Sequence, residues 1–115
     1  LEPGLGVKGV VPFICSSFGK EIGLYDGVLS WYQGDGKLGN FTITHRPGWG
    51  CPGQPRNNVS RDLFRVASMK GYLAFVQYLI SRWGEGYVVD DDDSLRKVML
   101  QLNAHLHESI ASLLG

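Results

Sequence analysis

Two cysteines and three histidines are the residues of this 115-residue chain best suited to metal binding or thiol chemistry. They are Cys15, His45, Cys51, His105 and His107. Zinc sites usually present such residues as close pairs, for example Cys-x-x-Cys, and the sequence has no pair of this kind. His105 and His107 are two residues apart, so on a helix they would point to different faces. The sequence therefore predicts no metal site, no cofactor and no catalytic residue.

Cys15 leaves one enzymatic alternative open. Together with a distant histidine it could act as a nucleophile, although a buried structural cysteine is the commoner case. The glycine-rich segment 48–53 lacks the Gly-Lys-Ser/Thr ending of a phosphate-binding loop and the spacing of a dinucleotide-binding loop. We therefore expect a protein that is not an enzyme, with a cysteine-dependent enzyme as the less favoured alternative.

The composition is typical of one globular domain spanning residues 1–115, with 43% hydrophobic and 19% charged residues. The formal net charge is zero, which argues against a dedicated nucleic-acid partner. Sparse cysteines and the lack of a visible signal peptide favour a cytoplasmic location. The apolar run 72–80 is too short for a bilayer, which needs about 20 residues, so membrane association would require a tail outside this sequence.

The stretch 57–83 is the longest run without proline and contains a single glycine. Beyond Tyr72 its apolar residues surround a helical wheel, which is typical of a buried helix. The stretch predicts two helices, 59–68 and 70–83, that meet near Gly71, with the second as the central helix of the fold. The acidic run 90–93 then favours the start of an amphipathic helix, because negative charge stabilises a helix N-terminus.

The first half of the chain is ambiguous. Apolar residues at helical spacing favour a helix from about Pro12 to Glu21, and the run 24–32 fits either a helix or a strand. Gly34-Asp35-Gly36 predicts a turn. Residues 41–45 alternate and are β-branched, so their local propensity is that of a strand. Prolines and glycines predict a loop over 46–58.

The segment 63–72 carries a family resemblance. Leu63-Phe64-Arg65, followed after five residues by Gly71, resembles the first homology motif of the Bcl-2 family of apoptosis regulators, which also runs into a buried helix. Residues 102–106, Leu-Asn-Ala-His-Leu, are similar to the segment before the second motif of that family. The resemblance covers residues 57–115. Tyr72 stands where the family has the arginine that pairs with the ligand's aspartate.

The resemblance implies an all-α, Bcl-2-like bundle around the buried central helix, which requires overriding the strand propensity of 41–45. It also implies an inhibitor of apoptosis that binds the amphipathic Bcl-2 homology 3 helix of pro-apoptotic relatives in a surface groove. An α+β protein-interaction module unrelated to apoptosis is the alternative. The groove would be lined by Val59, Asp62, Leu63, Met69, Gly71, Tyr72 and Ala74.

The same resemblance implies a short form of the family like those carried by large DNA viruses, acting in host–virus interaction. It adds the mitochondrial surface as a second location. The pro-survival or pro-death sign of the effect, the preferred ligands and a homodimer all remain open.

Overall fold

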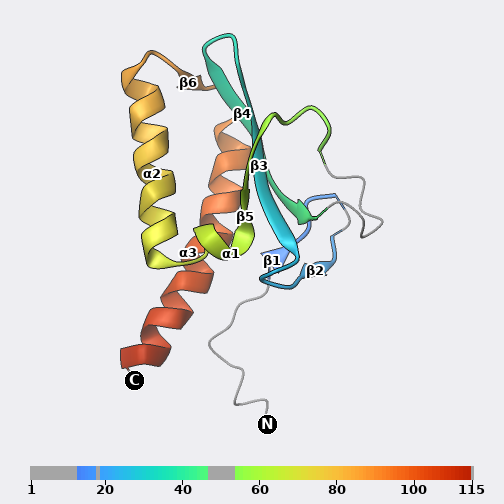
Figure 1. Cartoon of the computed structure of the whole chain (residues 1–115), viewed down its shortest axis with the longest axis vertical. Helices are drawn as coiled ribbons and strands as arrows, with labels where there is room; N and C mark the ends of the chain where they lie inside the picture. The colour runs from blue at the N-terminus through green and yellow to red at the C-terminus, as the bar shows by residue number, and fades with distance from the viewer. Residues whose placement is uncertain (1–12, 18, 47–53, 115) are drawn as a thin grey trace.

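The computed structural model of the protein describes residues 13–17, 19–46 and 54–114, and within that set the side chains through His107. It is an α+β fold in which helices pack against a four-stranded sheet, beside a second sheet of two short strands (Figure 1). In chain order the described elements are β1 (Phe13–Ile14), β2 (Glu21–Ile22), β3 (Gly27–Gly34), β4 (Lys37–His45), β5 (Val59–Asp62), α1 (Leu63–Val66), α2 (Met69–Gly84), β6 (Val88–Val89) and α3 (Asp92–Leu114).

The hairpin of β3 and β4 forms the centre of the sheet. Gly34 pairs with Lys37 across a two-residue loop, and both loop residues have positive φ, 54° at Asp35 and 73° at Gly36. Asp-Gly favours this turn because its twist matches that of the flanking strands. The predicted turn at Gly34-Asp35-Gly36 is thus confirmed, and it is the turn of a β-hairpin.

The larger sheet has the order β5-β3-β4-β6. β5 pairs antiparallel with β3, and β6 pairs parallel with the start of β4 through Lys37 and Leu38. Leu29 of β3 lies opposite Ile43 of β4 on one side and Arg61 of β5 on the other. Residues directly opposite each other share a face of a sheet, so Arg61 projects from the same face as the apolar Leu29 and Ile43.

A β-bulge interrupts the pairing of β3 and β4 between Ser30 and Tyr32. Asn40 lies in this part of β4 with a φ of 53°, a left-handed conformation that asparagine tolerates better than most residues. The extra residue lets Leu38 and Phe41, three positions apart, both reach the core with 1% and 2% exposure. The bulge therefore keeps the apolar residues of β4 on one face.

That face carries the hydrophobic core and is covered by α2 and α3 (Figure 1). The indole of Trp31 is fully buried, and its centroid lies 5.7 Å from the ring of Phe41 in β4 and 5.4 Å from that of Phe75 in α2. α3 packs chiefly on β4, and the Ser94 hydroxyl at its first turn accepts a 2.9 Å hydrogen bond from the backbone N–H of Phe41.

The opposite face of the sheet is polar at its centre, where Ser30, Thr42 and Thr44 are buried. The hydroxyls of Ser30 and Thr42 lie 3.2 Å apart across β3 and β4. The Asn57 side-chain amide, in the connection to β5, donates to the Ser30 hydroxyl at 2.9 Å and to the carbonyl of Asn40 at 3.0 Å. Because the Asn57 amide satisfies these polar atoms, this part of the face can be buried without apolar side chains.

The all-α bundle is therefore wrong, because strands occupy much of the segment that the bundle required to be helical. The described residues of the segment from Pro12 to Glu21 contain β1 and the first residue of β2, and Phe13 pairs with Ile22. The run 24–32 contributes most of β3, and residues 59–62 form β5. The strand propensity of 41–45, which the bundle required us to override, agrees with β4.

Two predicted helices are confirmed. Met69–Gly84 contains the predicted helix 70–83, and Asp92–Leu114 begins within the acidic run 90–93. α2 is not buried on every side, however, since Phe75 is its one fully buried residue. None of the described helices combines the length and the apolar character needed to cross a membrane. The predicted loop 46–58 lies partly outside the described residues, and 54–58 contain no helix or strand.

Candidate functional site

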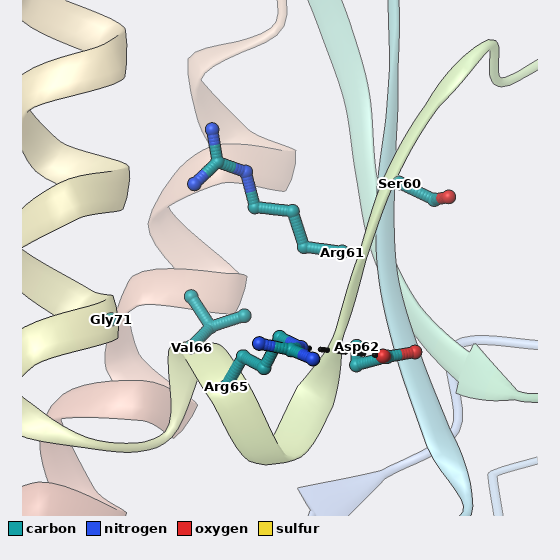
Figure 2. Close-up of a pocket in the computed structure, with 6 residues that line it drawn as sticks. All are labelled: Ser60, Arg61, Asp62, Arg65, Val66 and Gly71. Carbon is teal, nitrogen blue, oxygen red and sulfur yellow. Dashed lines mark ion pairs between the residues drawn. The ribbon is translucent and has the colours of Figure 1, made fainter.

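A cleft of about 410 Å³ opens between the β5–α1 segment and the first turn of α2 (Figure 2). Its lining combines arginine side chains with an aliphatic floor and the backbone of a glycine. The lining residues are Ser60, Arg61, Asp62, Arg65, Val66 and Gly71. Arg61 extends from β5 toward α2, whereas Ser60 points away from α2, as alternation along a strand requires.

The join between α1 and α2 shapes the bottom of this cleft. Ser68 caps α2 by accepting a hydrogen bond from the Gly71 N–H at 3.1 Å, and its hydroxyl donates to the carbonyl of Arg65 at 2.8 Å. A Cβ atom built on Gly71 would lie 1.6 Å from that carbonyl oxygen. Glycine is therefore required here because the backbone at the end of α1 lies directly against α2.

Asp62 organises the charges beside the cleft. Its carboxylate oxygens lie 2.9 Å from Nη1 of Arg46 and 3.6 Å from Nε of Arg65. Both oxygens thus contact arginines, one directly after β4 and one in α1. Among the residues that the structure describes, no carboxylate lies within ion-pair distance of Arg61.

Aromatic rings hold Arg61 instead. Its Cζ atom lies 5.1 Å from the ring centroid of Tyr78 in α2 and 5.9 Å from that of Trp31. A guanidinium within about 6 Å of an aromatic face is attracted by the ring quadrupole. Arg82 contacts the Tyr78 ring at 5.3 Å as well. This side of α2 is therefore basic.

A second surface runs along the solvent side of α2. Its large apolar side chains are exposed, from 45% at Met69 through 52% at Leu73 and 58% at Ile80 to 74% at Trp83. With the half-buried Val76 they recur at spacings of four, three, four and three residues. We call these five residues the α2 seam. The average spacing of 3.5 residues is that of a helix surface that packs against another helix.

The α2 seam continues into an apolar groove at the C-terminal end of the helix. This groove of about 330 Å³ lies between the last turns of α2 and strand β6. It is lined by Leu79, Ile80, Trp83, Val88 and Val89. Exposed apolar surface that is continuous in this way is typical of a protein-binding site rather than of scattered surface residues.

The structure disperses the residues predicted to line a ligand groove. Asp62 and Gly71 meet at the cleft, with the carbonyl of Arg65 occupying the space beside Gly71 where a ligand backbone was expected. Leu63 is fully buried in the core. The remaining four occupy separate places: Val59 and Tyr72 pack against the core, Met69 belongs to the α2 seam, and Ala74 is exposed.

Sequence reasoning missed Arg61 and most of the α2 seam. It predicts burial in a central helix for Leu73, Ile80 and Trp83. The spacing that marks the seam is nevertheless visible in the sequence. Arg61 was not separable from other basic residues, because its position over Tyr78 depends on the pairing of β5 with β3.

The cysteine and histidine residues do not assemble in the part of the chain that the structure describes. No three histidine, cysteine or acidic side chains there are placed to hold a metal ion. Cys15 is buried with 1% exposure, and the His105 ring packs 5.1 Å from that of Phe13. Cys51 lies outside the described residues.

Comparisons with protein-family models, with curated proteins and with solved structures found no match to this chain. The relationship to the Bcl-2 family and the role in apoptosis therefore stay predictions.

We predict that Gly71→Ala destabilises the protein by about 1–3 kcal/mol, because the new methyl group overlaps the Arg65 carbonyl and the α1–α2 join must open. Urea unfolding followed by circular dichroism measures the change. Gly84→Ala is the matched control in the same helix, where a Cβ meets nothing within 4 Å. It should change stability by less than about 1 kcal/mol. Equal stability of the two variants would contradict the packing role of Gly71.

Proposed function

We propose that this chain is a protein-interaction module that works through the α2 seam, and that the helix docking there is α2 of a second copy. The observation that carries the proposal is the exposure of four large apolar side chains at heptad spacing on one side of one helix. A surface helix usually directs polar residues to solvent, and in α2 the polar residues Lys70, Gln77 and Ser81 lie on a stripe beside the seam.

An antiparallel arrangement suits the seam. Two seams aligned in this way place Leu73 opposite Trp83 of the second copy and Val76 opposite Ile80 of the second copy. A two-fold axis repeats both contacts, as in most homodimers. Each large side chain then packs between residues of the facing helix, in the manner of helices with a 3.5-residue repeat.

The charges along α2 favour the same arrangement. Lys70 lies at its N-terminal end, whereas Glu85 and the acidic run 90–93 follow its C-terminal end. Antiparallel pairing brings Lys70 near Glu85 of the second copy, and it also opposes the two helix dipoles. A parallel pair would bring like charges together. The formal net charge of zero adds no overall repulsion between copies.

The pro-apoptotic helix is a second candidate occupant. It is favoured by one observation: the segment that resembles the Bcl-2 motif, 63–72, runs into the helix that bears the α2 seam. An amphipathic ligand helix could pack along this seam by the contacts proposed for a second copy. The site would then be one face of a single helix beside a sheet.

We predict a dimer in solution and its loss when the seam is charged. Sedimentation equilibrium at on the order of 100 µM protein should give a dimer mass for the wild type. Leu73→Asp and Ile80→Asp should each give a monomer, because dimerisation would bury an unpaired carboxylate. Leu100→Asp is the matched control, since Leu100 is 61% exposed but belongs to α3 and not to the seam. A monomeric wild type, or a monomeric Leu100→Asp variant, would contradict the proposal.

A second prediction fixes the direction of pairing. In a background carrying Cys51→Ser, mixing the Leu73→Cys and Trp83→Cys proteins under mild oxidation should give a disulfide-linked heterodimer, because antiparallel seams place these positions opposite each other. Leu73→Cys alone should remain largely unlinked. Mass spectrometry after non-reducing electrophoresis identifies the products. A homodimer of Leu73→Cys as the main product would indicate parallel pairing and contradict this arrangement.

The apoptotic candidate has its own test. Titration with a panel of peptides carrying pro-death helices, monitored by fluorescence anisotropy, should show micromolar binding by at least one peptide if this role is correct. Ile80→Asp should abolish that binding and Leu100→Asp should not. The absence of micromolar binding to every peptide would remove the apoptotic role and leave the self-association of the chain unaffected.

A further inference from the structure

We propose that the cleft between β5, α1 and α2 binds a small phosphorylated molecule through the guanidinium groups of Arg61 and Arg65. The proposal is independent of the α2 seam. Its basis is a pair of arginines at a cleft of about 410 Å³. The carboxylate beside them, that of Asp62, already forms ion pairs with Arg46 and Arg65. The volume lies within the range of about 300–1,000 Å³ that is usual for small-molecule sites.

The local charge defines the class of ligand. Arg46, Arg61 and Arg65 carry three positive charges around Asp62, which supplies one negative charge. Two positive charges are left without a counterpart among the described residues. A phosphate monoester carries about −1.5 to −2 at neutral pH, so one phosphate group balances the site.

The geometry of Arg61 suits an oxyanion. Tyr78 and Trp31 hold its guanidinium on the helix-facing side of β5, at 5.1 and 5.9 Å from their ring centroids. The planar group can donate paired hydrogen bonds to phosphate oxygens. Because the rings already restrict the side chain, less conformational entropy is lost when an anion binds.

Arg65 completes the site from α1. Its Nε faces Asp62 at 3.6 Å, and its Cζ lies 5.3 Å from the ring of Phe64. The side chain is 72% exposed. Its guanidinium is therefore accessible to an anion in the cleft.

The cleft and the α2 seam use different sides of α2. Tyr78, which lies beneath Arg61, is two positions before Ile80, so the two side chains project in roughly opposite directions at about 100° per residue. Substitutions in the seam should leave the cleft intact. Phosphate binding can thus be tested in the monomeric Leu73→Asp variant as well as in the wild type.

The test is a titration of the isotope-labelled chain with inorganic phosphate, monitored by nuclear magnetic resonance at constant ionic strength. The Arg61 Nε–H and the backbone amide of Gly71 should shift and saturate. Arg61→Gln should weaken binding at least about tenfold, the effect expected for a lost charge-assisted hydrogen bond. Arg96→Gln is the matched control, because Arg96 is an exposed arginine of α3 paired with Asp92 and Asp93.

Three results would overturn the proposal. One is shifts that rise linearly without saturation, which indicate non-specific ion effects. Another is equal weakening by Arg61→Gln and Arg96→Gln. The third is that succinate binds as tightly as phosphate. The two negative charges of succinate lie on separate carboxylates, so equal binding would mean that the site does not select a single phosphate group. If Arg61→Gln fails to fold, Arg65→Gln serves as the variant, and it too should weaken phosphate binding.

Discussion

The packing of Trp31 against rings from β4 and α2 is the interaction on which the rest of the structure depends. Its indole is fully buried at the middle of β3 and contacts Phe41, Phe75 and Tyr78 at centroid distances of 5.4–5.7 Å. Removing a buried aromatic side chain of this size typically costs about 3–5 kcal/mol. Phe75 and Tyr78 can both face Trp31 only at one rotation of α2 about its axis. That rotation turns Leu73 and the rest of the α2 seam toward solvent.

Local signals in the sequence were sufficient for the elements that fold from their own residues. Asp35-Gly36 predicts the turn, the proline-free stretch 57–83 predicts α2, and the acidic residues before α3 mark its start. β5 could not be predicted in this way. Its four residues have no strand pattern of their own and are extended because they pair with β3, about 30 residues earlier. Such a pairing depends on contacts distant in the sequence, which periodicity does not report.

The apolar character of α2 was misread for a related reason. A helical wheel shows which residues of a helix are apolar. It does not show which of them are buried in the core and which are exposed to solvent. In the structure Phe75 is buried and Leu73 is half exposed, although both are large and apolar. The motif match at Leu63 and Gly71 likewise identified real constraints, a core leucine and a glycine packed on backbone. Those constraints come from the α1–α2 join. Any fold with such a join would impose them.

Two sides of α2 have different surroundings. On one side Phe75 and Tyr78 pack on Trp31, and Tyr78 also supports Arg61 at the cleft. On the other side the α2 seam faces solvent. Because the sheet fixes the first side, changes in the seam have little reason to disturb the core. The cleft, in contrast, depends on the packing of the core. Arg61 rests on rings that also bind α2 to the sheet, so anything that moves α2 away from Trp31 removes the support of the arginine as well. The position of Arg61 is therefore coupled to the packing of the core, whereas the exposed side chains of the seam are not.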